Sequence, residues 1–140
     1  MSRQLYENET NRKNEQSAKM NLEDRWSVSL RKLPIKYGAE WVAFRGDQAV
    51  AVIEYKNRPH DSTRFPTYLL SVHKWMSMMS LANTIGVPAI LVVEFVDGMR
   101  HCTLEDEMAT TAWAGRRDRG DADDLEPCMM IPMDRFGYIR

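Results

Sequence analysis

The sequence predicts an α/β fold in which helices flank a mixed central sheet. Two apolar stretches of strand length, Gln48–Lys56 and Ala89–Val96, stand on either side of a long helix-like stretch, Thr67–Ile85. A helix of that length can serve as a crossover, so the two strands can be parallel neighbours. Two apolar regions are each interrupted by turn-forming residues, which predicts two β-hairpins. The expected order is therefore helix, strand, strand, helix, strand, strand.

The length and composition suit one domain. The chain has 140 residues, of which 44% are hydrophobic and 28% charged, as in ordinary globular proteins. We expect one domain over residues 1–140, with its core at about 5–104. No apolar run is long enough to cross a membrane, and the N-terminus lacks a secretory signal pattern. Two cysteines without zinc-site spacing favour a reducing compartment, so we expect a cytoplasmic protein.

The charge is unevenly distributed along the chain. The first 60 residues carry 11 Lys and Arg against 8 Asp and Glu, whereas residues 61–140 carry 8 against 12. A net charge of −1 argues against a protein that coats nucleic acid through bulk charge. A phosphate-binding surface is expected on the N-terminal half, although random scatter of charge is an equally good explanation.

The N-terminal part is expected to form a helix and then a β-hairpin. Residues 5–29 contain no Gly or Pro, and Leu22, Trp26 and Leu30 are spaced by four, as on one helix face. The stretch Glu40–Arg45 is a strand candidate, and the turn residues after it lead into the strongly apolar second strand.

The C-terminal part is expected to add a helix, a second hairpin and an extension. The helix Thr67–Ile85 is expected to end at Gly86, which suits the left-handed position after a helix. The stripe expected on this helix contains Leu69, Val72, Met76 and Met79, with Trp75 and Ala82 beside it. Ala89–Val96 and Met99–Leu104 form the second hairpin. Residues 105–140 are an extension in which 129–133 could form an edge strand, limited by its proline.

A charged pair stands at the end of the most apolar strand. Glu54 and Lys56 are two residues apart, so their side chains project from the same face. The rest of this strand is apolar, and burying such charges is costly unless they are paired or bind a metal. The pair is therefore a candidate functional site.

Glu40 can join this pair if the hairpin has the right register. In an antiparallel hairpin, the numbers of any two paired residues add up to the same constant. If that constant is even, Glu40 pairs with an even-numbered residue and its side chain lies on the same face as that of Glu54. A two-residue loop gives an odd sum and the wrong face. A three-residue loop or a bulge near residues 45–47 is therefore required, and Gly46 makes it plausible.

Two carboxylates on one face offer the hard oxygen ligands that suit Mg²⁺ or Mn²⁺. The backbone carbonyl of Tyr55 lies between the charged pair and could be a further ligand. A metal held there can activate water and polarise a phosphoryl oxygen. Lys56 could position that water or stabilise charge on the phosphate. The pattern thus favours metal-dependent cleavage of phosphodiester bonds.

At this point the chain resembles the PD-(D/E)XK nuclease superfamily. The resemblance rests on Glu40, on Glu54-Tyr55-Lys56 across a Gly-containing hairpin, and on the long helix that follows. It spans residues 5–104 by element order. It implies a restriction-endonuclease-like core, DNA as the favoured substrate and a divalent metal. The general character of the sequence is similar to that of small nuclease-like proteins of phage and prophage. Nucleases of this class often form homodimers.

The resemblance implies further site residues. An acid on the N-terminal helix often completes the metal site in this superfamily, and Glu15 is the candidate here, although Glu7, Glu9 and Glu23 compete with it. A polar residue on the helix after the motif often contacts phosphate, and Lys74 could be its counterpart. Arg58 in the following loop and Lys36 before the hairpin are further candidates for contacting the nucleic-acid backbone.

Two departures from the motif keep other functions open. Glu40 replaces the expected Asp and Ala39 replaces the expected Pro. The longer Glu side chain bears on activity more than on fold, so a non-cleaving module that binds nucleic acid or protein is the alternative. A plain structural domain, in which Glu54 and Lys56 are an ordinary solvated pair and Glu40 a surface acid, is the third interpretation.

Overall fold

The computed structural model describes residues 9–34, 38–115 and 125–139. A six-stranded sheet has the order β1-β2-β3-β5-β6-β9, and a three-stranded sheet has the order β4-β8-β7. The elements are α1 (Glu9–Trp26), β1 (Ser29–Lys32), β2 (Trp41–Arg45), β3 (Gln48–Asn57), β4 (Thr67–Ser71), α2 (Val72–Ile85), β5 (Ala89–Phe95), β6 (Gly98–Thr103), β7 (Thr110–Gly115), β8 (Leu125–Pro132), a 3₁₀ turn (Met133–Arg135) and β9 (Gly137–Tyr138).

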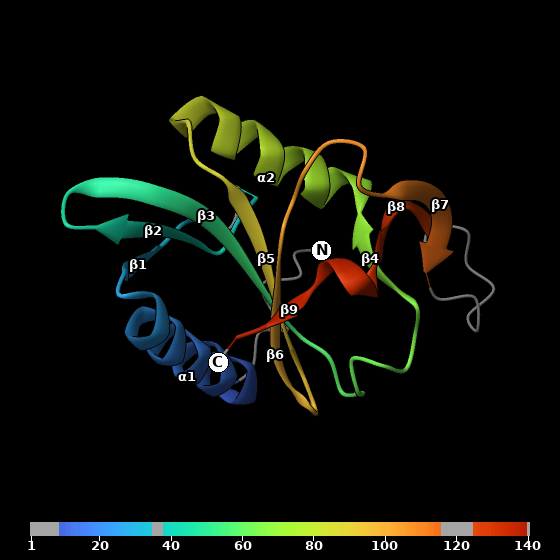
Figure 1. The fold of residues 1–140 in the computed structure, drawn as a ribbon, viewed down its shortest axis with the longest axis horizontal. Coiled ribbons are helices and arrows are strands. Elements are labelled where there is room, and N and C mark those ends of the chain that lie inside the picture. The colour runs from blue at the N-terminus through green and yellow to red at the C-terminus, as the bar shows by residue number, and fades with distance from the viewer. Residues whose placement is uncertain (1–8, 35–37, 116–124, 140) are drawn as a thin grey trace.

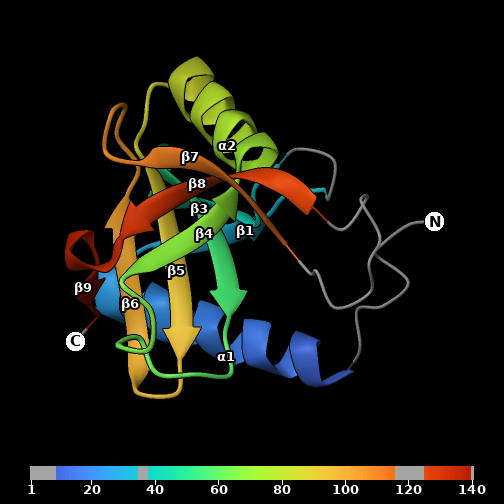
Figure 2. The ribbon, with the colours of Figure 1, turned by 90° about the vertical axis from the view of Figure 1, so that its right-hand side faces the viewer.

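The elements form three layers. One core cluster joins α1 to one face of the large sheet, through residues such as Leu22 and Ile53. The other joins α2 and the small sheet to the opposite face, through residues such as Met78, Val52 and Ile131. Figure 1 shows the large sheet between the two helices, and Figure 2 shows the three strands of the small sheet side by side. The predicted mixed α/β fold is confirmed.

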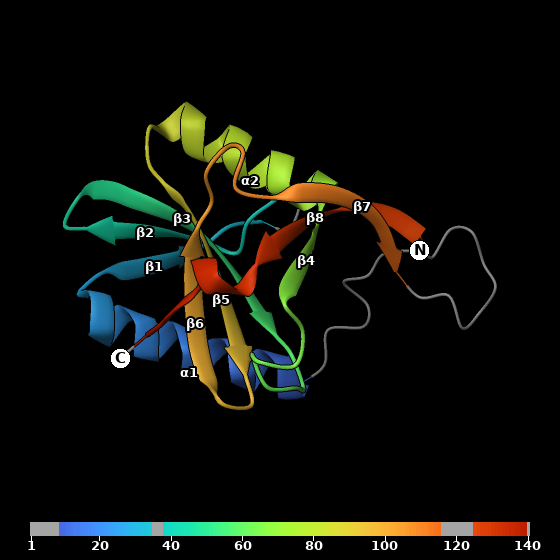
Figure 3. The ribbon, with the colours of Figure 1, turned by 45° about the vertical axis from the view of Figure 1, so that its right-hand side comes forward.

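The predicted pairing at the centre of the sheet is also confirmed. β3 and β5 are parallel neighbours, and their pairing places Glu54 beside Leu91 and Lys56 beside Val93. β2 and β3 form the expected antiparallel hairpin, with Arg45 paired with Gln48. Figure 3 shows these strands from the side of the second sheet.

The hairpin contains the bulge that the site requires. Next to the turn, Phe44 pairs with Ala49, but beyond it Ala43 pairs with Ala51. Val50 is therefore an extra residue on β3, a few positions from the turn where we expected the bulge. Because of it Trp41 pairs with Ile53, and the preceding residue, Glu40, falls in line with Glu54.

Three sequence-based expectations about the helices are wrong. Leu30 lies on β1 and not on the N-terminal helix, which ends at Trp26. Thr67–Ser71, expected as the start of a helix, forms β4, and α2 begins after Ser71, whose side chain accepts a hydrogen bond from the backbone N–H of Lys74. The buried residues of α2 are Trp75, Met78 and Ala82, whereas Leu69 of β4 and Met76 of α2 are exposed.

The C-terminal extension contributes more than an edge strand. Residues 129–133 overlap β8, which pairs with β4 on one side and β7 on the other. Its proline, Pro132, sits at the end of β8, where it does not interrupt the ladder. The expectation of an edge strand is therefore wrong. The predicted C′ role of Gly86 is confirmed, since Gly86 caps α2 in the left-handed conformation with φ of 85°.

None of the helices in the described ranges is long and apolar enough to cross a membrane.

Candidate functional site

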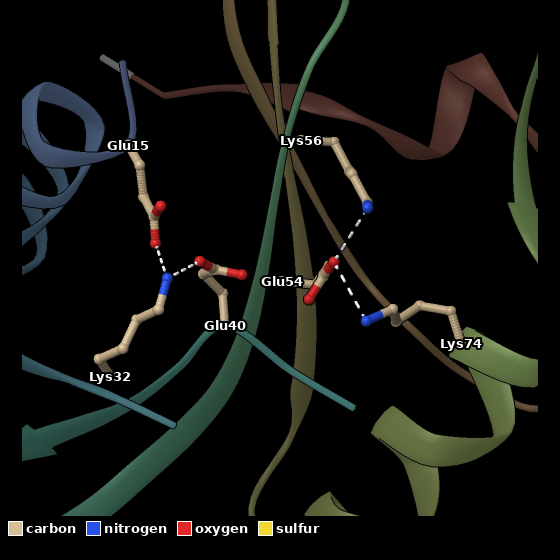
Figure 4. Close-up of polar contacts among 6 residues, drawn as sticks. All are labelled: Glu15, Lys32, Glu40, Glu54, Lys56 and Lys74. Atoms are coloured by element: carbon tan, nitrogen blue, oxygen red, sulfur yellow. Dashed lines mark hydrogen bonds and ion pairs between the residues drawn. The ribbon is translucent and has the colours of Figure 1, made fainter. Parts of the chain in front are cut away.

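Six charged side chains gather where β1 ends, β2 begins and β3 nears its end. They come from five elements or their flanks and are Glu15, Lys32, Glu40, Glu54, Lys56 and Lys74 (Figure 4). Sequence analysis named five of these residues, and the structure brings those five together. Lys32 was missed, because it lies on a short polar strand that was assigned to a helix and its flank.

Glu54 is the most buried charged group of the site. Its residue is 2% exposed, and it lies on β3 between apolar neighbours. Lys56 Nζ lies 3.4 Å from Glu54 Oε2, and Lys74 Nζ lies 3.5 Å from the same oxygen. The other oxygen, Oε1, is buried without a hydrogen-bond partner among the described residues. A buried carboxylate oxygen left in this state is costly, so the site favours an additional positive ligand.

Burial and the two neighbouring lysines have opposite effects on the pKa of Glu54. Burial raises the pKa of this carboxyl above its usual value, and the nearby charge of Glu40 adds to the rise. Lys56 and Lys74 lower the pKa but do not fully offset the burial. Two ammonium groups therefore leave this carboxylate under-compensated, as expected of a group that awaits a cation.

Glu40 faces Glu54 and also contacts a third lysine. One carboxylate oxygen of Glu40 accepts a hydrogen bond from Lys32, and the other points toward Glu54 (Figure 4). Burial acts to raise the pKa of Glu40, but Glu15, Lys32 and Lys56 outweigh it and hold the pKa below its usual value. These neighbours therefore favour the ionised form of Glu40.

Lys32 joins Glu15 to Glu40. Its ammonium donates to a carboxylate oxygen of each acid, and its side chain is 48% exposed. Burial, followed by the hydrogen bond with Glu40, raises the pKa of Glu15 to about 7. Glu15 thus comes to the site from α1, as the sequence suggested, but in this structure it is linked to the site through a lysine.

The side chains of this site have the chemistry needed to bind a divalent cation. Glu40 and Glu54 supply hard oxygen donors on one face, and Glu54 Oε1 has no competing partner among the described side chains. No group of three His, Cys, Asp or Glu side chains forms a ready-made metal cluster in the described parts of the chain. Two carboxylates with the Tyr55 carbonyl and water would therefore be the ligand set.

The remaining candidates lie around this centre or outside the described residues. Arg58 follows β3 and lines a neighbouring pocket. The Tyr55 side chain lies on the α1 side of the sheet, where its hydroxyl donates to Glu94 Oε1 at 2.6 Å. Lys36 falls outside the described residues.

Comparisons with known proteins identify a family and show similarity to solved structures. Residues 1–139 match the sequence profile of the family described as "Phage putative PDDEXK endonuclease". The fold is similar to that of Hjc, a Holliday junction resolvase from the archaeal hyperthermophile Archaeoglobus fulgidus. The TM-score is 0.59 at 16% identity, over 91% of this chain and 92% of the other. No curated protein matches this sequence.

Proposed function

Because this chain belongs to the phage PDDEXK endonuclease family, we propose that it cleaves DNA with a divalent cation held by Glu40 and Glu54. Membership supports nuclease activity of the PD-(D/E)XK type, and the dependence on a metal is part of our proposal. The ion and the residue roles are our proposal. Mg²⁺ or Mn²⁺ suits two carboxylates with a backbone carbonyl, here that of Tyr55. DNA as the substrate is supported by the likeness to a Holliday junction resolvase.

One observation carries the proposal, namely the buried Oε1 of Glu54, which has no hydrogen-bond partner among the described residues and faces Glu40. A cation bound there would polarise the phosphate and lower the pKa of a bound water. Lys56 would hold the attacking water, since its ammonium lies 3.4 Å from Glu54. Lys74, which enters from the first turn of α2, would contact a phosphate oxygen.

Glu15, Arg58 and Lys36 have supporting roles in this proposal. Glu15 would hold Lys32 and so fix the orientation of Glu40. Arg58 and Lys36 would contact the DNA backbone. The family is described as one of phage, so we propose that the protein acts in the host cytoplasm as one domain over residues 1–140. A homodimer would allow two strands to be cut together.

The test is cleavage of supercoiled plasmid and of circular single-stranded DNA with Mg²⁺, Mn²⁺ or EDTA. We expect the wild type to cut with a divalent ion and Lys56→Ala to lose at least a hundred-fold in rate. Arg25→Ala, which removes an exposed cation ten residues after Glu15 on α1, is the matched control. Equal cleavage by the wild type and Lys56→Ala under every metal would reject the proposal.

A non-cleaving binding module is the second candidate. It is favoured by Lys32, whose ammonium already neutralises Glu40, and by the Glu that stands in place of Asp. Titration of the protein with Mn²⁺ by calorimetry separates the two candidates. DNA binding without Mn²⁺ uptake would favour the module, whereas uptake that disappears in Glu54→Gln would favour the nuclease.

A further inference from the structure

A pocket of about 390 Å³ lies between the loop after β3 and the start of the second sheet. Its walls include Arg58, His60 and Phe65 from the loop, Tyr68 from β4, Phe95 from β5 and Met133. Ligand pockets in proteins are commonly about 300–1,000 Å³. The volume therefore has room for a nucleobase-sized ring system with its attached group.

The walls combine aromatic rings with the guanidinium group of Arg58, and Arg64 lies beside Phe65 without being part of the walls. The His60 ring centroid lies 5.2 Å from that of Phe65 and 5.6 Å from that of Phe95. The guanidinium of Arg58 lies 5.3 Å from the centre of the Tyr68 ring, and that of Arg64 lies 5.3 Å from the centre of the Phe65 ring. Phe65 is 50% exposed. Aromatic faces beside cations are the combination that binds unpaired bases.

Tyr68 supplies an unused hydrogen-bonding group in this wall. The residue is 5% exposed, and its hydroxyl is buried without a partner among the described residues. Leaving a buried hydroxyl unpaired costs about 1–3 kcal/mol. Burial raises the pKa of Tyr68 to about 12, so the group is a neutral donor. A ring nitrogen or carbonyl of a ligand would accept its proton in a hydrogen bond.

The pocket adjoins the charged site along one strand. Glu54, Lys56 and Arg58 alternate with residues of the other face, so they share one side of the chain. The Arg58 backbone N–H donates to the Glu94 carbonyl at 2.9 Å and continues the β3–β5 pairing. Two residues of strand span about 7 Å. A nucleotide next to the phosphate at Lys56 would therefore reach Arg58.

The loop that forms the pocket is tied to the sheet. The backbone N–H and hydroxyl of Ser62 donate to Asp97 at 2.7 and 2.6 Å, at the turn between β5 and β6. The Val96 N–H donates to the His60 carbonyl at 3.1 Å. Figure 3 shows this loop beside that turn. The pocket is thus held open before any ligand binds, which lowers the entropic cost of binding.

We propose that this pocket binds an unpaired nucleobase of the strand whose phosphate lies at Glu54 and Lys56. The base would stack on the exposed face of Phe65, with His60, whose ring is perpendicular to that of Phe65, beside it, and the Tyr68 hydroxyl would donate to the edge of the base. The inference rests on the proposed function and names its substrate class: DNA that is single-stranded or has an unpaired nucleotide at the point of cleavage. A base within a duplex would have to leave its stack to enter.

The test is binding of DNA in EDTA, where no cleavage occurs. The probes are a single-stranded oligonucleotide, the same strand in a full duplex, and a duplex with one unpaired base, each carrying 2-aminopurine at the test position. We expect the first and third probes to bind at least ten-fold more tightly than the full duplex, with a change in 2-aminopurine fluorescence. Phe65→Ala should reduce this preference by about ten-fold.

Two variants serve as controls. Phe65→Trp keeps an aromatic face and should keep the preference. Trp113→Ala removes an exposed aromatic ring of β7 outside the pocket and should also keep it. Because Phe65 is half exposed, Phe65→Ala should fold, which thermal unfolding checks.

The inference is overturned if the wild type shows no preference for unpaired DNA, or if Phe65→Ala keeps the preference within two-fold. Its failure is distinct from failure of the proposed function. Metal-dependent cleavage without the preference would reject the pocket alone. A preference that depends on Phe65, together with equal activity of the wild type and Lys56→Ala, would reject the cleavage proposal alone.

Discussion

Glu40 and Glu54 occupy matching positions on the two arms of one hairpin, because Val50 adds a residue to β3 between them and the turn. Without that residue the register would put the two carboxylates on opposite faces of the sheet. The bulge therefore determines whether these acids can act together. Glu54 itself lies on a central strand and is buried deeply enough that Lys56 and Lys74 do not fully compensate its charge.

The first prediction concerns Glu54→Gln. Burial raises the pKa of Glu54, so the folded state disfavours its charge, and the neutral amide should leave stability unchanged or raise it by about 1 kcal/mol. The same change should abolish the rise in melting temperature that saturating Mn²⁺ gives the wild type. Urea unfolding and thermal melts with and without Mn²⁺ measure both effects. A loss of more than about 2 kcal/mol would mean that the lysine pairs outweigh the cost of burial.

The second prediction concerns Lys32→Met. The ammonium of Lys32 donates to both Glu15 and Glu40, and its removal leaves the two neighbouring carboxylates without their shared cation. Since Lys32 is about half exposed, the expected loss is only about 1 kcal/mol at pH 8, and it should shrink at pH 5 as Glu15 takes up a proton. Urea unfolding at the two pH values measures it. Arg31→Met, on the same strand, should show no such pH dependence; an equal dependence would contradict the prediction.

The third prediction concerns the pH dependence of stability. The pKa of Glu15 is about 7 in the folded protein and near 4.5 when unfolded, so the folded state binds the extra proton between these values. The Glu15 contribution is therefore fully present below about pH 4.5 and is lost as pH rises through 7. Glu15→Gln should differ least from the wild type at pH 5 and become progressively more stable than the wild type by pH 8. Unfolding midpoints at pH 5, 6, 7 and 8 test this, and a constant difference would contradict it.

The centre of the fold and most of the site follow from local rules. The face shared by Glu54 and Lys56 follows from strand alternation. The need for a three-residue loop or a bulge follows because a two-residue loop would put Glu40 on the wrong face. The end of α2 at Gly86 follows from the preference for glycine at the left-handed position after a helix. Each of these depends on residues close together in the sequence, so a single chain contains enough information to predict them.

The missed features depend on contacts between distant segments. Residues 67–71 fit a helical period, but their pairing with β8 makes them a strand. Lys32 reaches the site only because β1 pairs with β2, and a four-residue polar strand carries little signal of its own. The pocket at Phe65 is assembled from the loop, β4, β5 and the segment after β8. No pattern within one segment indicates it.

The last prediction concerns Gly38, which precedes Glu40 and lies against α2. Its φ of +78° is unfavourable for other residues, and an added Cβ would lie 2.4 Å from the Cβ of Ser77. Gly38→Ala should therefore both strain the backbone and push the start of β2 away from α2, costing about 2–3 kcal/mol and moving Glu40 relative to Glu54. Gly46→Ala is the matched control, because its φ of +62° carries similar strain but nothing lies within 4 Å of the added atom. Gly46→Ala should cost only about 1 kcal/mol.

Urea unfolding measures the stability of each variant, and titration with Mn²⁺ tests whether Glu40 and Glu54 still lie where they can bind the ion. Gly38→Ala should lose affinity for Mn²⁺, whereas Gly46→Ala should keep it. Equal behaviour of the two variants would show that contact between Gly38 and Ser77 does not position Glu40.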